Sequence, residues 1–474
     1  MSVKGASPVP NPQNAPEPTL DGHLVREGRS HPVTVAPSGR TALRVSFNDG
    51  EPPDGTEFEA LVVTVGGCEE RLSPCRFEAG GCDRFAGSLV FLDDVYDTRA
   101  LIYDGTVVTP RGALASLPLV LSNKDAVRPQ FRAYVADAMY DLSVWRKFFD
   151  DEEHLLEGEK PDAAEAVRRA LLKTYGPEFF AAFERQLAEL NLQVEGFTPQ
   201  EHERHGFYLR RHAWPYILAS EFMRRSNVKP YGYAGDAEMM RIIYENRYVG
   251  ATTFERLMHK YALEIPASRA VRNRRAVVAG ALRALADEWG AVKGGLRVLS
   301  VAAGPAWEIQ DVVLDSRDAE RFRFTLLDQD SYALGAAREV VARHERARGV
   351  PLRVAFVQES VRTMVRARLA DRVGRFHCIY SMGLFDYLAM PVARAVLARL
   401  YDLVEPGGVL LVGNFHAANP SRVYMEYWGD WKLLYRTEAS MLAMAQDLPG
   451  ATASVGFDET RCQMFLRVDA PVGG

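Results

Sequence analysis

Two short features of this chain together have the chemistry to hold an adenosine. Residues 302–306 (Ala-Ala-Gly-Pro-Ala) follow an apolar run, Leu296–Val301, and precede an expected helix start at Trp307 and Glu308. Asp328 ends the next apolar run. Small residues let the backbone approach a ligand, a helix start offers free N–H groups, and an acid can accept both ribose hydroxyls. The pair predicts a nucleoside site.

The rest of this region supplies the elements that would position these residues. Short apolar runs alternate with helical stretches, as a doubly wound parallel sheet requires. The last two runs follow each other without a long helix between them, so the final strand should pair antiparallel. Strands are expected at 296–301, 322–328, 352–358, 376–380, 409–413, 451–455 and 462–468, with a helix at 391–403.

Residues from about 270 to 470 resemble class I methyltransferases that use S-adenosylmethionine. The resemblance rests on the turn at 302–306, on Asp328 and on the Pro-Gly-Gly element at 406–408. It implies that the turn meets the amino-acid part of the cofactor, that Asp328 binds the ribose and that Glu359 and Ser360 flank the adenine. The cofactor-binding residues expected in full are Ser300, Ala302, Ala303, Gly304, Glu308, Asp328, Gln329, Glu359, Ser360 and Ser381.

The turn departs from the family pattern in two ways. Ser300 stands where an acid is usual, and Ala302 and Ala306 stand at two usual glycines. Because alanine is tolerated where φ stays negative, we expect a slightly different turn in which Gly304 keeps the special conformation. A dehydrogenase with a nicotinamide cofactor would use a similar turn. The Pro-Gly-Gly element and the closing antiparallel hairpin argue against it.

A loop at residues 229–236 (Lys-Pro-Tyr-Gly-Tyr-Ala-Gly-Asp) is the second feature with chemical potential. A solvent loop has little reason to expose two large aromatics. Tyr231 and Tyr233 are therefore expected to cover a bound substrate or cofactor. Asp236 either caps the helix Ala237–Glu245 or contacts the active site.

Together with the core, this loop is similar to bacterial proteins for the biosynthesis of 3-hydroxypalmitic acid methyl ester. The resemblance also uses residues 270–275 and 413–420, and it covers roughly residues 125 to 470. It implies a small, lipid-like acceptor, a 3-hydroxy fatty acid that is methylated on its carboxylate. Such a carboxylate is already ionised at neutral pH and needs no general base, whereas a hydroxyl or amine acceptor would need one.

Three residues are expected to be catalytic: His416, Tyr387 and Tyr233. His416 follows the fifth strand and either acts as a base, donates a hydrogen bond to the acceptor or caps a loop. Asp386 and Tyr387 have a comparable place after the fourth strand, where Tyr387 would orient the acceptor. Arg272, Arg274 and Arg275 either bind an anionic group or form a solvated face. The expected substrate-binding residues are Tyr231, Asp236, Asn414, Tyr424 and Tyr427, of which the last two either line an acyl channel or pack in the core.

Composition sets the frame for these expectations. The chain has 474 residues, 47% of them apolar, and a net charge of -5. No basic field should attract nucleic acid, and neither a spanning segment nor a secretory signal is apparent. We expect a cytoplasmic protein. The sequence does not indicate its oligomeric state. Cys68, Cys75 and Cys82 lack the spacing of a zinc site, so no metal is expected.

The expected fold is α/β, with a Rossmann-like, doubly wound methyltransferase sheet whose last strand is antiparallel. The predicted parts are a disordered segment at 1–30, a small β-barrel or sandwich at 31–122, a helical lid or substrate region at 123–265 and the methyltransferase domain at 266–474. Helices are expected at 128–149, 163–172, 177–192 and 199–225, the last kinked at Pro215.

The β domain faintly resembles a PilZ domain, a module that binds cyclic di-GMP. Arg40 and Arg44 match the arginine spacing of that family, but its second sequence element is missing. A degenerate structural or docking module is therefore favoured, with no ligand assigned. The alternative function for the whole chain is a ligand-responsive regulator whose core binds the cofactor without turnover.

Overall fold

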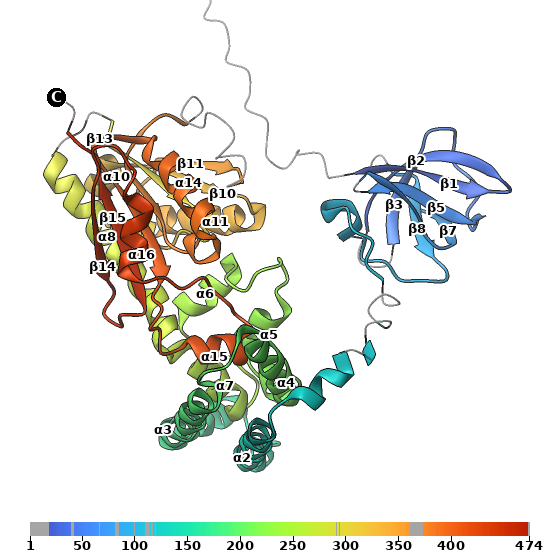
Figure 1. Ribbon diagram of the computed structural model, residues 1–474, viewed down its shortest axis with the longest axis horizontal. Coiled ribbons are helices and arrows are strands. Elements are labelled where there is room, and N and C mark those ends of the chain that lie inside the picture. The colour runs from blue at the N-terminus through green and yellow to red at the C-terminus, as the bar shows by residue number, and fades with distance from the viewer. Residues whose placement is uncertain are drawn as a thin grey trace, which may run out of the picture. The chain divides into compact units, whose positions relative to one another are not determined.

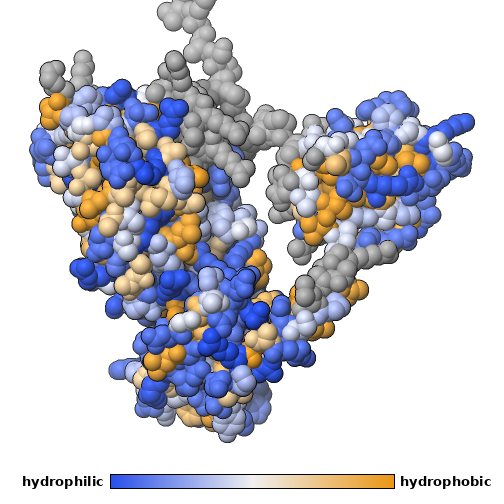
Figure 2. Space-filling view, in the orientation of Figure 1, coloured by the Kyte–Doolittle hydropathy of each residue, from blue (hydrophilic) through white to orange (hydrophobic). Residues whose placement is uncertain are grey.

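The computed structural model describes residues 19–472, apart from 39–41, 66, 81–84, 99, 110–113, 115–116, 119, 291, 293 and 361–372. The chain divides into two compact units, Met1–Ala126 and Val127–Gly474 (Figure 1). On the face seen in Figure 2, polar and apolar residues are interspersed over the surface of both. Among the described residues, no helix combines the length and the apolar character that crossing a membrane requires.

The first unit is an eight-stranded antiparallel sheet that curls so that one of its ends lies beside β1. Its order is β4-β7-β8-β3-β2-β1-β5-β6, with antiparallel pairing throughout. Only Glu59 separates β4 from β5, and its N–H donates to the Val25 carbonyl of β1 at 2.8 Å, so the β4 end of the sheet lies beside β1. The strands are β1 (Leu20–Arg26), β2 (Arg29–Pro37), β3 (Ala42–Phe47), β4 (Glu57–Phe58), β5 (Ala60–Val65), β6 (Cys68–Arg71), β7 (Cys75–Ala79) and β8 (Gly87–Phe91), and the helical turns η2 (Ala100–Asp104) and η3 (Asn123–Ala126) follow.

Part of the segment that was expected to be disordered is ordered. Residues 20–30 form β1, a two-residue turn and the start of β2, because Leu24 fills the core that Val33 and Val35 also enter. Residues 1–18, and with them most of that segment, lie outside the described residues, as do Arg40 and Cys82. Arg44 lies over the Phe85 ring, with its guanidinium carbon 4.9 Å from the ring centroid.

The second unit contains a seven-stranded sheet in the order β11-β10-β9-β12-β13-β15-β14. The first five strands along the chain pair in parallel, and β15 runs antiparallel to both β13 and β14. The predicted antiparallel last strand is confirmed. The strands are β9 (Leu296–Val301), β10 (Phe322–Asp328), β11 (Val354–Gln358), β12 (Phe376–Ser381), β13 (Val404–Phe415), β14 (Thr452–Phe457) and β15 (Gln463–Asp469).

Alternating side chains of these strands fill two separate cores. On one face Val298 and Tyr380 pack with α8, α9 and α11, and on the other Leu299 and Ile379 pack with α14 and α16. The chain leaves β9 for β10 in one direction and later reaches β12 in the other, which creates a switch point at the carboxyl ends of β9 and β12. The helices of this part are α8 (Pro266–Trp289), α9 (Glu308–Val312), α10 (Ser316–Arg321), α11 (Ser331–Arg348), η4 (Phe385–Tyr387), α14 (Met390–Tyr401) and α16 (Glu438–Ala445).

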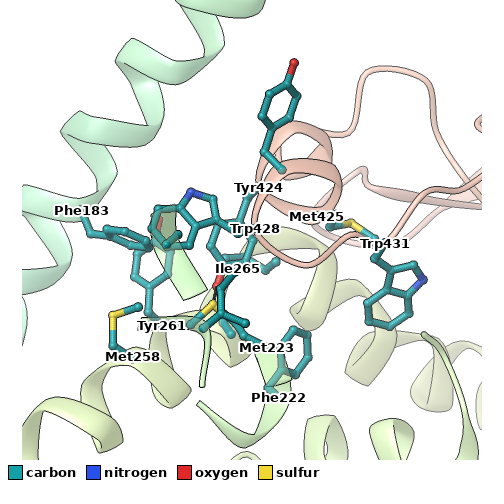
Figure 3. Packing of buried hydrophobic residues seen from close by; sticks show 14 of the residues in the cluster. Phe183, Phe222, Met223, Met258, Tyr261, Ile265, Tyr424, Met425, Trp428 and Trp431 are labelled. Carbon is teal, nitrogen blue, oxygen red and sulfur yellow. Dashed lines mark hydrogen bonds between the residues drawn. The ribbon is translucent and has the colours of Figure 1, made fainter. Parts of the chain in front are cut away.

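The remaining helices share an aromatic core with a segment of the sheet domain. The short helix α15, which follows β13, brings Trp428 to 5.1 Å from Phe183 and Tyr424 to 5.7 Å from Tyr261 between ring centroids (Figure 3). The helical region is thereby packed onto the sheet domain. Its helices are α2 (Pro129–His154), α3 (Pro161–Val194), α4 (Pro199–Ile217), α5 (Glu221–Val228), α6 (Ala237–Glu245), α7 (Thr253–Glu264) and α15 (Arg422–Tyr427).

Two expected helix boundaries are wrong. α3 runs through Pro177 as one helix, because Phe179 and Phe183 are buried in the same core as Leu172, and this packing outweighs the missing N–H bond. The helix expected at 199–225 is two helices. α4 ends at Ile217, shortly after Pro215, and the Ser220 side chain accepts from the Met223 N–H to start α5.

Candidate active site

A cavity of about 350 Å³ lies at the switch point. Its walls come from the loop at 229–236, from α6 and α8, from the ends of β9, β10 and β12, and from the segment between Phe415 and Leu433. The volume lies at the lower end of the range that small-molecule sites span. Carboxyl ends of strands at a switch point are where open α/β sheets bind ligands.

In the turn after β9, the two alanines have a backbone conformation that was not expected. Ala302, Gly304 and Ala306 all have positive φ, at 52°, 55° and 50°. Alanine in this conformation is strained by about 1–2 kcal/mol. Two hydrogen bonds to β10 hold the turn, from the Ala303 N–H to the Leu327 carbonyl at 3.1 Å and from the Gly304 N–H to Asp328 Oδ2 at 2.9 Å. The turn therefore adopts the glycine-type conformation in spite of its alanines.

Asp328 connects this turn to the end of β10. Its carboxylate accepts from Gly304 on Oδ2 and from the Asp330 N–H on Oδ1 at 3.0 Å. Burial raises the pKa of Asp328, and these backbone N–H groups oppose the rise. The Gln329 N–H also donates to this carboxylate. A carboxylate has about four acceptor positions, so one remains for a ligand hydroxyl. A Cβ placed on Gly304 would meet nothing within 4 Å. The open space above Gly304 and the remaining acceptor position fit a ribose.

Arg274 places a buried positive charge in the cavity wall. Its guanidinium donates to the Met382 carbonyl at 3.2 Å and to the Tyr244 hydroxyl at 3.3 Å. Within the described residues it forms no ion pair at 4.0 Å or less. Its neighbours differ, because Arg272 pairs with Glu264 and Arg275 pairs with Asp311. A buried cation without a carboxylate partner is suited to an anionic ligand group.

Glu308 and Tyr380 form a buried pair beneath the turn. The Tyr380 hydroxyl donates to Glu308 Oε1 at 2.7 Å, and burial raises the pKa of Glu308. Both residues line the cavity. The sequence had indicated Glu308 but gave no signal for Tyr380, which lies inside an apolar strand.

Tyr387 is positioned to donate a hydrogen bond into the cavity. Its oxygen accepts from the Trp431 indole N–H at 2.9 Å and from the Gly235 backbone N–H. A phenol has two acceptor positions and one O–H donor, so the O–H remains for a ligand. A Cβ on Gly235 would lie 2.8 Å from the Tyr387 oxygen and 3.0 Å from Trp431 Cζ2. This explains why position 235 is a glycine. The same loop also places Tyr233 in the cavity wall.

Asp386, beside Tyr387, also lines the cavity, although the sequence assigned it no role of its own. The residue is only 2% exposed, and its Oδ1 accepts from the Phe415 N–H at 2.7 Å. Burial raises its pKa to about 7, while the Phe415 N–H and the charges of Arg274 and Arg436 act in the opposite direction. Its place after the fourth strand is the sequence signal that pointed to it together with Tyr387.

The expected site residues fall into two groups. The first lines the cavity, and eight of its members come from the expected cofactor set. This group is Ser300, Ala302, Ala303, Gly304, Glu308, Asp328, Gln329 and Glu359, together with Tyr233 and Tyr387. The second group lies outside the cavity lining and consists of Ser360, Ser381, Tyr231, Asp236, Asn414, His416, Tyr424 and Tyr427.

His416 and Asn414 lie on the wrong face of the sheet for the expected roles. Phe415 lines the cavity, and neighbouring residues of a strand point to opposite faces. His416 Nε2 instead lies 3.2 Å from Glu438 Oε2 and its ring packs edge-on against Phe457. Asn414 is bonded to the Arg436 guanidinium.

Asp236 and Tyr231, which also lie outside the cavity lining, contact other side chains of the protein. Asp236 caps α6 through the Met239 N–H at 2.8 Å and pairs with Arg225 at 2.8 Å, so the structure shows its capping role. Tyr231 is 42% exposed, and its ring centroid lies 5.4 Å from that of Tyr332.

The two tyrosines of α15 pack in the helical core and not along a channel. Tyr424 is buried there, and the Tyr427 hydroxyl forms a hydrogen bond with His202 Nδ1 at 3.0 Å. Ser381 is also fully buried, and Ser360 follows the cavity residue Glu359. Within the described part of the chain, no group of three or more His, Cys, Asp or Glu side chains could hold a metal ion.

Comparison with known proteins gives structural likenesses only. No protein-family model and no curated protein matches this sequence. A solved structure described as a possible exported protein from Bordetella parapertussis is 18% identical, with a TM-score of 0.43 over 66% of this chain and 100% of that chain. Magnesium protoporphyrin IX methyltransferase from Synechocystis PCC 6803 with bound SAH is 13% identical, with a TM-score of 0.33 over 43% and 86%. N-methyltransferase NodS from Bradyrhizobium japonicum WM9 is 16% identical, with a TM-score of 0.29 over 41% and 96%. At these TM-scores the likenesses support no functional inference.

Proposed function

We propose that this protein is an S-adenosylmethionine-dependent methyltransferase whose acceptor is a small molecule bound in the same cavity. The observation that carries the proposal is the bond between Gly304 and Asp328 at the switch point. It joins a turn open to a ligand with a carboxylate that retains an acceptor position for a ribose hydroxyl. Glu359 and Gln329 line the adjoining wall, where the adenine would lie.

The charged residues of the cavity fit the other end of this cofactor. Its methionine part carries a carboxylate and an ammonium group, and the wall supplies Arg274 and Glu308. When bound, the cofactor supplies an electrophilic methyl group on a sulfonium. The main contribution of the protein is then to hold the acceptor in line with that methyl group, which is a positioning task. The free O–H of Tyr387 would orient the acceptor.

The identity of the acceptor is the finer part of the proposal. The sequence resemblance implies the carboxylate of a 3-hydroxy fatty acid, and Arg274 supports an anionic group in the cavity. Tyr424 and Tyr427 do not support a long acyl channel, because both pack in the helical core. A hydroxyl or amine of a small metabolite is the second candidate, and the buried carboxylate of Asp386 favours it.

Calorimetry on the full chain with S-adenosylmethionine and S-adenosylhomocysteine tests the cofactor. Asp328→Asn is the sharpest variant, because its amide oxygen can still accept from the Gly304 N–H and keep the turn. We expect it to weaken binding by about 1–3 kcal/mol through lost charge-assisted hydrogen bonds. Asp458→Asn is the matched control, since Asp458 is a buried aspartate outside the cavity lining that accepts from the Gln463 N–H at 3.0 Å.

Three outcomes are informative. Equal affinity for wild type and Asp328→Asn would refute the ribose role of Asp328. Failure of the wild type to bind either compound would refute the proposal as a whole. A labelled-methyl screen over long-chain 3-hydroxy acids, phenols and amines then separates an enzyme from a ligand-responsive regulator, which would bind the cofactor without transfer.

A further inference from the structure

Asp386 lies on the side of the cavity that the expected cofactor residues leave free. Ser300, Gly304 and Asp328 come from the ends of β9 and β10. Asp386 and Tyr387 follow β12, and they share their part of the wall with Phe415, Trp431 and Leu433. If the cofactor occupies the first group of residues, the acceptor must approach its methyl group from the second.

The Asp386 carboxylate has few partners for a group so deeply buried. Among the described residues only the Phe415 N–H donates to it, and that bond occupies Oδ1. No lysine, arginine or histidine of the described chain lies within ion-pair distance of it. Burying a carboxylate without a paired cation is costly. Oδ2 is therefore left to interact with whatever enters the cavity.

We propose that Asp386 takes the proton of the methyl acceptor, and that the acceptor consequently presents an N–H or O–H group to the cofactor. This inference rests on the proposed methyltransferase function and specifies the acceptor class. In the step, the lone pair of the acceptor nitrogen or oxygen forms a bond to the methyl carbon. The bond from that carbon to sulfur breaks with its electron pair left on sulfur, and the acceptor proton passes to Asp386 Oδ2 and later to water.

The charges around Asp386 suit it to this role. Arg274 on α8 and Arg436 on the segment before α16 stabilise the carboxylate at a distance, and Tyr387 and Tyr435 are the other titratable groups near it. Burial outweighs the two arginines and leaves the pKa at about 7. A base with a pKa near the working pH is the most effective proton acceptor.

An acceptor that is itself a carboxylate fits this position less well. Two carboxylates that share one site cannot both remain ionised, so one of them would have to hold a proton. An amine or hydroxyl has the opposite need, because it must lose a proton to become or remain a good nucleophile. Arg274 stays available for an anionic group elsewhere on the cofactor or the acceptor.

The chemical stability of the methylated product tests the inference on the wild-type protein alone. We expect a labelled-methyl panel that contains a primary amine, a phenol and a long-chain 3-hydroxy acid to give a product that resists mild alkali. An alkali-labile methyl ester as the main product would overturn the inference and leave the methyltransferase function intact. Absence of transfer to any acceptor would overturn both.

Asp386→Asn gives the second test, because asparagine can still accept from the Phe415 N–H. We expect kcat to fall by about 10²–10⁴-fold with cofactor affinity within twofold of wild type. The rate of the wild type should fall below about pH 7, where Asp386 becomes protonated, and the variant should lack this limb. Asp458→Asn should keep the wild-type rate and profile.

A readout independent of turnover is the carboxyl group itself. Difference infrared spectra should show a protonated carboxyl band that titrates near pH 7 in the wild type and in Asp458→Asn, and that is missing in Asp386→Asn. A wild-type rate in Asp386→Asn, or an unchanged titrating band, would overturn the assignment.

Discussion

Replacing Ala302 by glycine should stabilise the second unit of the protein, against the usual effect of glycine. Ala302 has a φ of 52°, a conformation that costs an alanine about 1–2 kcal/mol and costs glycine little. Glycine also adds freedom to the unfolded chain, which lowers stability by about 0.4–1 kcal/mol. The methyl group of Ala302 is exposed, so its removal forfeits little burial. We expect a net gain of about 0.5–1 kcal/mol.

Urea unfolding followed by tryptophan fluorescence measures this gain in the right part of the chain. All six tryptophans lie in the unit Val127–Gly474, so the signal reports on that unit alone. Ala303→Gly is the matched control, because Ala303 has no positive φ and its methyl group is buried. It should lose about 1–2 kcal/mol from added chain entropy and lost burial. If Ala302→Gly lowers the midpoint as much as Ala303→Gly, the turn does not hold Ala302 at positive φ in solution.

Two further substitutions test the acceptor side of the cavity. Gly235→Ala should displace Tyr387 and Trp431, because the new Cβ would lie 2.8 Å and 3.0 Å from their side chains. We expect kcat to fall by about 10–100-fold, while the cofactor Kd measured by calorimetry stays near that of wild type. An unchanged kcat would argue against the role of Tyr387. His416→Ala should leave kcat and cofactor affinity unchanged, because the His416 side chain lies on the opposite face of the sheet beside Glu438. A tenfold loss of turnover would show that this placement is wrong.

The strands of the second unit could be read from the sequence because each is a short apolar run bounded by turn residues. The prediction for His416 was wrong because it considered only that the residue follows a strand and did not consider which face of the sheet the side chain occupies. Val409 and Leu411 pack on the face of the sheet that carries the cavity, and the same alternation places Phe415 there and His416 opposite. That information was present in the sequence, since the strand alternates with a period of two.

Other features depend on packing that no local pattern contains. Alanine at positive φ is unfavourable by itself, so the conformation of Ala302 becomes predictable only once the bonds from Ala303 and Gly304 to β10 are known. The aromatic segment around Tyr424 reads equally well as a ligand wall or as a core. Its contact with Tyr261, from a helix far away in the sequence, decides for the core.

The charges in the cavity wall show most clearly why a site of this kind requires the structure. Arg274 and Asp386 lie on different elements of the chain, and the sequence does not show that either side chain is buried. Their significance comes from what they lack, because both are buried and neither forms an ion pair within the described residues. Each is close enough to influence the other, so the two opposite charges partly offset the cost of burying both. A direct ion pair would offset this cost more completely but would use up both groups. The wall instead keeps a cation and a carboxylate that are each free to contact a ligand.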